Sequence, residues 1–294
     1  MSISAAQVKQ LRDQTGAGMM DAKKALTETS GDMEAAIDWL RTKGIAKAAK
    51  KAGRTAAEGM VWATAQDGKG VMVEVNSETD FAAKNEQFQT FATTLGQLVL
   101  ETGETDMDKL QAMTYPGTSE TVADMQTKMI ATIGENINFR RASYMEADTV
   151  GAYIHMGGKI GVLVGLSGTT GNEDLAKQVA MHVAATNPQF LTIDDMDPDV
   201  VAREKAVYTE QAKASGKPEN VVEKMVEGRM RKFGEEVCLA EQAFVMDTDR
   251  KVSQVVADAA AGAALVGFTR FALGEGIEKE EADFAAEVAK AVNG

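Results

Sequence analysis

Cysteine and histidine are almost missing from this chain of 294 residues. The one cysteine, Cys238, excludes an internal disulfide and a zinc site built from cysteines. Its own role, as a small buried hydrophobe or as a reactive thiol, stays open. The two histidines are His155 and His182, and no HExxH pair occurs. His182 lies between Val179 and Val183 in a run with helical spacing, which favours a buried structural histidine over a ligand.

Sequence signals of catalysis and of nucleotide binding are also missing. The chain has neither a GxxxxGK[ST] phosphate loop nor a complete GxGxxG fingerprint, and no pair of carboxylates stands out as an acid–base site. We therefore expect no catalytic residue, no metal ion and no cofactor. No apolar run approaches the roughly 20 residues of a membrane helix, and the first residues do not resemble a signal peptide. The sequence predicts a soluble, cytoplasmic protein that does not act at membranes.

Basic side chains are fewer than acidic ones, 31 against 44, and the formal net charge is −13. Non-specific binding to nucleic acid depends on cations that neutralise phosphates, so this charge argues against a direct nucleic-acid partner. It favours a partner with a basic face. Residues 41–54 are an exception, because they contain six basic side chains and no acidic one. This stretch is either a solvated helix or linker, or a contact patch for an acidic surface.

The first 54 residues predict three short helices. The first follows a capping-box pattern that begins at Ser4, and the second runs from about residue 19 to residue 29. The third begins at Asp32 and ends at Gly44, since glycine commonly terminates helices.

Beyond these helices, the sequence predicts two copies of a β-hairpin followed by a helix, which form two similar α+β subdomains. The expected positions are strands 60–64 and 71–75 with one helix from the loop at 76–80 to about Leu100, then strands 151–155 and 160–164 with a helix over 173–185. Further expected elements are helices near 106–113 and 119–133, a helical hairpin over 198–233, a strand at 267–271 and a terminal helix over 280–292.

We therefore predict an α+β fold with a two-subdomain core that contains antiparallel sheets. The expected domains are an N-terminal three-helix (UBA-like) module and basic linker (1–54), core subdomain N (55–148), core subdomain C (149–197 and 234–271), a helical hairpin or coiled-coil insertion (198–233) and a C-terminal helical module (272–294).

The loop before the first long helix contains Glu78-Thr79-Asp80-Phe81. Thr79 or Asp80 can cap the helix that follows. Phe81 then begins a stripe that continues through Phe88 and Phe91 with helical spacing, which favours a core position. The alternative is an exposed phenylalanine at the tip of the helix, with Asp80 beside it.

Four stretches of the chain resemble elongation factor Ts, the bacterial nucleotide-exchange factor for elongation factor Tu. They are Leu11-Arg-Asp-Gln-Thr-Gly-Ala-Gly-Met-Met-Asp-Ala-Lys-Lys-Ala-Leu26, Val73-Glu-Val-Asn-Ser-Glu-Thr-Asp-Phe81, Gly267-Phe-Thr-Arg-Phe-Ala-Leu-Gly-Glu-Gly-Ile-Glu-Lys279, and Ile133-Gly-Glu-Asn-Ile137 with Arg140-Arg141. The similarity runs from end to end, and one departure is Ala22, where many relatives carry cysteine.

This resemblance implies the predicted fold and a function in nucleotide exchange, without enzymatic activity. It also implies contact residues for elongation factor Tu, with Asp80 and Phe81 pushing between helices of the partner near its Mg²⁺ site, so that bound GDP is affected indirectly. The implied partner-binding residues are Asp80, Phe81, Thr79, Ile133, Gly134, His155, Lys23, Met20, Val245 and Met246, together with the C-terminal helix.

Several alternatives stay open at this point. Asp80 acts either by its charge near Mg²⁺ or by fixing the loop. The helical hairpin dimerises, contacts the partner or does neither. A binding module without an exchange role, and a hydrolytic enzyme that uses unrecognised carboxylates, are the competing classes of function.

Overall fold

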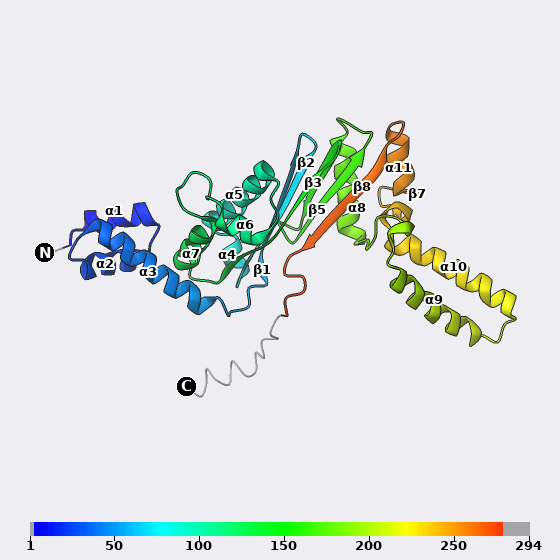
Figure 1. Cartoon of the computed structure of the whole chain (residues 1–294), viewed down its shortest axis with the longest axis horizontal. Coiled ribbons are helices and arrows are strands. Elements are labelled where there is room, and N and C mark those ends of the chain that lie inside the picture. Colours follow the sequence, from blue (N-terminus) through cyan, green and yellow to red (C-terminus); the bar gives the residue numbers. More distant parts are fainter. Residues whose placement is uncertain (1–2, 279–294) are drawn as a thin grey trace. The chain divides into compact units, whose positions relative to one another are not determined.

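The computed structural model describes residues 3–278 and shows a mixed α+β protein with helices at its N-terminus and small antiparallel sheets (Figure 1). The described chain divides into two compact units. Unit 1 contains the residues up to 61, residues 73–142 and the residues from 272, and unit 2 contains residues 62–72 and 143–271. This division into two units does not test the five predicted domains, whose boundaries remain a prediction.

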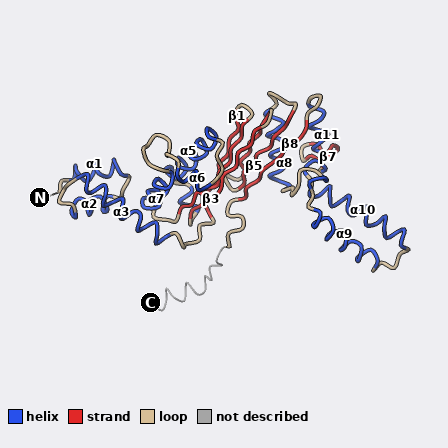
Figure 2. The backbone as a smooth tube through the Cα atoms, in the orientation of Figure 1, coloured by secondary structure: helices blue, strands red, loops and turns tan. Residues whose placement is uncertain are grey.

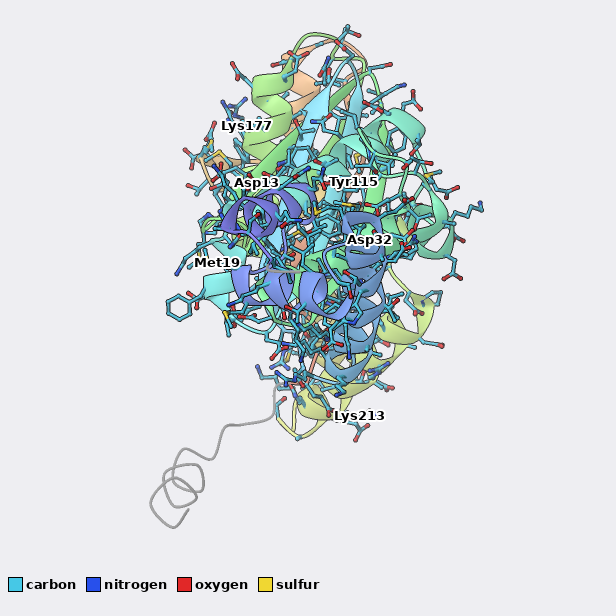
Figure 3. All side chains as sticks on the ribbon, turned by 90° about the vertical axis from the view of Figure 1, so that its left-hand side faces the viewer. Asp13, Met19, Asp32, Tyr115, Lys177 and Lys213 are labelled. Carbon is cyan, nitrogen blue, oxygen red and sulfur yellow. The ribbon has the colours of Figure 1, made fainter. Side chains whose placement is uncertain are left out.

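Unit 1 begins with three helices, α1 (Ala5–Thr15), α2 (Met19–Glu28) and α3 (Met33–Lys51). Figure 3 labels Asp13 in α1, Met19 in α2, and Asp32, which caps α3. These helices bury a small core of their own, formed by Leu11, Ala22, Ala25, Leu26 and Ala36. The three-helix prediction is confirmed for this part of the chain.

The predicted end of the third helix at Gly44 is wrong. Helix α3 continues through Gly44 to Lys51, and Gly44 is buried in its middle. A Cβ atom on Gly44 would lie 3.5 Å from the Cβ of Ala131, which belongs to α7 (Val122–Ile133). The glycine therefore serves the close packing of two helices, and helix packing outweighs its low helix propensity.

The first predicted hairpin is confirmed as β1 (Glu58–Gln66) and β2 (Lys69–Ser77). Asp67 and Gly68 form the turn, both with positive φ (51° and 74°), as a tight hairpin turn requires. A third strand, β3 (Ile137–Glu146), completes a sheet of order β1-β2-β3 and was not predicted from the sequence.

The single helix that was predicted between residue 80 and Leu100 is two helices. Helix α4 (Asp80–Ala83) is one turn long, and the Asn85 side chain then accepts a hydrogen bond from the Gln87 backbone to cap α5 (Glu86–Thr102). Because the chain leaves the helical path at Lys84 and Asn85, Phe81 does not continue the buried face of α5. The short helix α6 (Met107–Ala112) and then α7 follow, as the sequence predicts.

Unit 2 contains a sheet of order β4-β5-β8, formed by β4 (Thr149–His155), β5 (Ile160–Ser167) and β8 (Ala264–Ala272). Helix α8 (Glu173–Thr186) packs on this sheet, and its core includes Val162 and Val164 of β5 with Val179 and Val183 of α8. Gly151 permits this packing, because a Cβ there would lie 2.3 Å from the backbone carbon of Ala176. The second predicted hairpin-and-helix is confirmed.

Two long helices of unit 2, α9 (Pro198–Lys213) and α10 (Glu219–Val237), form the helical hairpin that was predicted over 198–233 (Figure 2). Ala212, Val222 and Val226 form their shared core. Helix α10 runs four residues past the predicted end at 233. The short strands β6 (Ala243–Phe244) and β7 (Asp247–Lys251) and helix α11 (Val252–Ala259) were not predicted. The predicted terminal helix at 280–292 lies outside the described residues.

Candidate functional site

Among the described residues of unit 1, the most exposed large apolar side chain belongs to Phe81, which is 78% accessible. Thr79 is the N-cap of α4, and its hydroxyl accepts a hydrogen bond from the Ala82 backbone. Helix α4 therefore begins at Asp80 and carries Phe81 outward on its first turn. The core position that periodicity favours for Phe81 is wrong, and the exposed alternative holds.

A carboxylate from another part of unit 1 holds the start of α4. Both the backbone N–H and the hydroxyl of Thr79 donate to Glu135, at 2.9 and 2.7 Å. Glu135 follows Ile133, the last residue of α7, and Gly134, which caps α7 with a φ of 88°. We call the two Thr79–Glu135 hydrogen bonds the clamp. The clamp holds the predicted residues Ile133 and Gly134 close to the loop that presents Phe81.

Glu78 makes a second connection from the same loop. Its carboxylate accepts a hydrogen bond of 2.6 Å from the Asn136 backbone and pairs with Arg54 at 3.4 Å. The Asn136 side chain in turn donates to the Arg54 carbonyl at 2.8 Å. The loop, the segment after α7 and the linker after α3 are therefore joined in one network.

Lys84 connects Asp80 with Phe81. Its ammonium group bonds to the Asp80 carboxylate at 2.6 Å and lies 5.4 Å from the centre of the Phe81 ring. A lysine one turn beyond an aspartate is a favourable helical pair, and a cation over an aromatic ring is attracted to its face. The sequence spacing of Asp80 and Lys84 carried this signal, although Lys84 was not among the predicted residues.

A buried charge cluster lies on strand β2, ahead of the loop. Glu74 is fully buried and bonds to Arg140 at 3.0 Å, Arg141 at 2.6 Å and the Gly274 backbone at 2.9 Å. Burial raises the pKa of Glu74, but its hydrogen bonds with Gly274 and Arg141 outweigh this effect and hold the pKa below its ordinary value. Glu74 is therefore an anion that attaches the turn at Gly274 to the sheet.

Two further predicted residues of unit 1 lie on α2. Met20 is 75% exposed, and Lys23 is exposed one turn later. Met19, labelled in Figure 3, is also largely exposed. Helix α2 thus presents apolar side chains and a cation to solvent, next to the buried face that holds the three helices together.

The remaining predicted residues lie in unit 2. His155 is the last residue of β4, is half-buried, and is hydrogen-bonded through Nδ1 to the Tyr153 hydroxyl at 3.0 Å. Met156 follows it in the turn and is 71% exposed. Met156 is next to the predicted contact residue His155 in the sequence, but it was not itself predicted as a contact residue.

Val245 and Met246 form the turn between β6 and β7, and both are about half exposed. The buried His182 supports this turn, because its Nδ1 accepts a hydrogen bond from the Val245 backbone at 3.2 Å while Nε2 bonds to Gln242 at 2.8 Å. Burial lowers the pKa of His182 despite the opposing effect of Gln242. The structural role predicted for His182 is confirmed.

Cys238 is fully buried in the same unit, and burial raises the pKa of its thiol. This environment suits a small hydrophobe rather than a reactive thiol. Within residues 3–278, no group of three or more potential ligand side chains could hold a metal ion. None of the helices described is long and apolar enough to cross a membrane.

Comparison with known proteins decides the family. The family model described as elongation factor TS matches residues 78–275. The elongation factor Ts of Magnetococcus marinus is 56% identical, with all of both chains covered. Those of Parvibaculum lavamentivorans and Bartonella henselae are 56% and 55% identical over at least 99% of each chain. The chain belongs to the elongation factor Ts family.

This membership confirms the resemblance seen in the sequence and the function that it implied. The chain is a translation elongation factor that serves as the nucleotide exchange factor for elongation factor Tu, and the family is not one of enzymes. The residues that support the exposed loop were not predicted as site residues. Glu78 and Glu135 lie inside the motifs that carry the resemblance, but only the fold shows that Glu78 accepts from Asn136 and that Glu135 accepts from Thr79.

Proposed function

We propose that this chain promotes release of GDP from elongation factor Tu by inserting Phe81 between helices of the partner close to its Mg²⁺ site. The exposure of Phe81 on a firmly held turn is the observation that carries the proposal. An apolar ring that is 78% accessible gains by burial in a partner. Because Glu135 and Glu78 already fix the loop, little conformational freedom is lost when the ring is buried.

The energetics of exchange require more than this ring. Binding that weakens the partner's hold on GDP must be weakened equally by GDP, because coupling between two ligands is reciprocal. A thousandfold acceleration corresponds to about 4 kcal/mol, whereas burial of a phenylalanine side chain gives about 1.5–3 kcal/mol. Other surfaces therefore hold the partner while Phe81 disturbs the Mg²⁺ and phosphate contacts.

We assign this holding role to the exposed residues on the other elements. The residues that supply it are Met20 and Lys23 on α2, Ile133 and Gly134 beside the loop, and His155 with the Val245–Met246 turn. Met20, Ile133, Val245 and Met246 are apolar and at least partly exposed, which suits a protein interface. The predicted domains provide these surfaces separately, and the encounter takes place in the cytoplasm. GTP then binds the open partner and displaces the chain.

The release rate of a fluorescent GDP analogue from elongation factor Tu tests the proposal. A catalytic amount of this chain should accelerate release in the presence of excess unlabelled nucleotide. A binding module without an exchange role would form the complex and leave the release rate unchanged, and that result would refute the proposed function.

The Phe81→Ala variant tests the role of the ring itself. Loss of its burial energy should slow exchange by about tenfold to a hundredfold. The melting temperature should stay within about 2 °C of the unchanged chain, because an exposed side chain contributes little to folding. Val207→Ala removes another exposed apolar side chain, on α9, and serves as the matched control with normal exchange.

A further inference from the structure

A groove of about 670 Å³ lies along the C-terminal half of α3 in unit 1. Its walls come from α3, α7, the start of β3 and Ile277 near the end of the described chain. Helix α3 and its C-cap contribute four apolar side chains at positions i, i+3, i+4 and i+7, which share one face, namely Ile45, Ala48, Ala49 and Ala52. Ile130 of α7 adds to the apolar lining. Ile45 remains 55% exposed beside this groove.

Basic side chains accompany the apolar stripe along α3. Lys47 pairs with Asp21 at 2.8 Å, and Arg54, just beyond the helix, pairs with Glu78 at 3.4 Å. Lys50 and Lys51 lie between them, and neither forms an ion pair with another described residue. Their charges are therefore available to an acidic ligand. The proposed exchange function names no acidic group that would bind them.

The structure brings the last described residues to the same groove. Glu74 accepts a hydrogen bond from the Gly274 backbone, and the Ile277 backbone donates to the Gly274 carbonyl at 3.0 Å. Gly274 has a φ of 71°, and a Cβ there would lie 2.4 Å from the Ala57 carbonyl oxygen. This close contact and the Glu74 cluster fix the point where the chain continues beyond Ile277.

The sequence that follows matches the groove in both polarity and spacing. Phe284, Val288 and Val292 are four residues apart, so the helix predicted over 280–292 would carry them on one face. Residues 280, 283 and 287 are acidic and also follow helical spacing, and they flank that apolar face. The tail thus pairs an apolar stripe with an acidic row, whereas α3 pairs an apolar stripe with a basic one.

We propose that residues 279–294 bind the groove along α3 of their own chain when the protein is free, with the apolar face of the tail on Ile45, Ala49 and Ala52 and its acidic row near Lys50 and Lys51. The helix predicted over 280–292 would be about 20 Å long, and the stretch from Ile45 to Arg54 spans about 14 Å at the same rise per residue. The tail is therefore long enough to cover the groove directly from Ile277.

Binding of the tail gives the basic stretch of α3 a role that does not depend on nucleotide exchange. It covers exposed apolar side chains of α3 and braces the helix against α7. Since the inference concerns the free protein, a failure of the proposed exchange mechanism leaves it untouched, and the reverse also holds.

Amide hydrogen exchange of the free protein, without elongation factor Tu, tests this binding. Compared with the full chain, a chain that ends at Glu278 should exchange its amides between residues 45 and 54 about tenfold faster, because a covered helix opens less often. The full-length variant Phe284→Asp should give the same result. Amides of α9 and α10 are the internal control and should not change. Equal exchange in all three proteins would overturn the proposal.

A charge exchange tests the pairing of the two rows. The double variant Lys50→Glu with Lys51→Glu should accelerate exchange over residues 45–54 in the same way. Adding Glu280→Lys, Asp283→Lys and Glu287→Lys should restore protection, which a general loss of helix stability would not explain. Protection that grows with protein concentration would overturn binding within one chain and would show that the tail of a second copy fills the groove.

Discussion

The loop around Phe81 in unit 1 and the Val245–Met246 turn in unit 2 present apolar side chains to solvent with different kinds of support. Carboxylates support the first, with Glu135 bonded to Thr79 and Glu78 bonded to Asn136. A neutral imidazole supports the second, because burial lowers the pKa of His182 while its Nδ1 accepts the Val245 N–H. The two surfaces should therefore respond differently to substitution and to pH.

This difference has a physical reason. Phe81 lies in the first turn of α4, and the unpaired N–H groups of a helix N-terminus favour acceptors with negative charge. The Val245–Met246 turn joins two strands and has no such helix end at its base. A single buried acceptor, held by Gln242, is enough to orient it.

The largest effect on stability should come from Glu74, the buried carboxylate on β2 that precedes the Phe81 loop. Replacement Glu74→Ala leaves Arg140 and Arg141 without their buried partner and frees the Gly274 N–H. Breaking a buried ion pair by removal of one partner costs about 3–5 kcal/mol. We expect the lower end of this range, because both arginines are partly exposed, and chemical denaturation would measure it. A loss below about 1 kcal/mol would show that water replaces the carboxylate.

The sequence predicted elements where local signals agree with packing. The hairpin turn at Asp67–Gly68 and the cap at Asp32 are local, and both are confirmed. Gly44 misled the prediction because its missing side chain serves contact with Ala131, which lies far away in the sequence. Strand β3 was not predicted, although Arg140 and Arg141 within it belong to one of the stretches that carry the family resemblance.

The candidate site shows the same limit. Helical spacing placed Phe81 and Phe88 on one buried face, and the break at Asn85 separates them. Only the family resemblance favoured the exposed position before the fold was known. The clamp from Glu135 could not be predicted, since it depends on where α7 ends relative to α4, and no local pattern encodes that arrangement.

Substitution of Glu135 should affect exchange more than folding. Glu135→Ala removes the carboxylate that accepts hydrogen bonds from the backbone N–H and the hydroxyl of Thr79. The start of α4 is then held less firmly, although the Phe81 side chain itself is unchanged. We expect exchange to slow by about tenfold, equivalent to about 1.4 kcal/mol, and unfolding to cost about 1–2 kcal/mol less. Glu101→Ala on the exposed side of α5 is the matched control. Normal exchange in Glu135→Ala would show that the loop needs no clamp.

Acidification should weaken the support in unit 2. In the unfolded chain, histidine takes up a proton as the pH falls below about 6.5, whereas burial lowers the pKa of His182 in the folded protein. Between these two values the unfolded state binds more protons, so the free energy of unfolding decreases as the pH falls from about 6.5 toward the folded pKa.

Melts between pH 7.5 and 5 measure this loss. In His182→Gln, the part of the pH dependence that belongs to this imidazole should vanish, whatever the variant's stability at neutral pH. An NMR titration of His182 gives an independent check. A folded pKa at or above 6.5 would contradict the prediction, and the turn would then have a charged support like the Phe81 loop.

The smallest effect should come from the ion pair on the surface of α4. Lys84 and Asp80 are both substantially exposed, so Lys84→Met should change stability by less than about 0.5 kcal/mol. We expect Asp80 to act by positioning, because its carboxylate holds Lys84 against the Phe81 ring. Lys84→Met and Asp80→Asn should then slow exchange alike, by about twofold to threefold, which is the range of a weak cation–ring contact. If Asp80→Asn slows exchange far more than Lys84→Met, the charge of Asp80 acts on the partner directly, and the carboxylates of this region serve the reaction as well as the support of the loop.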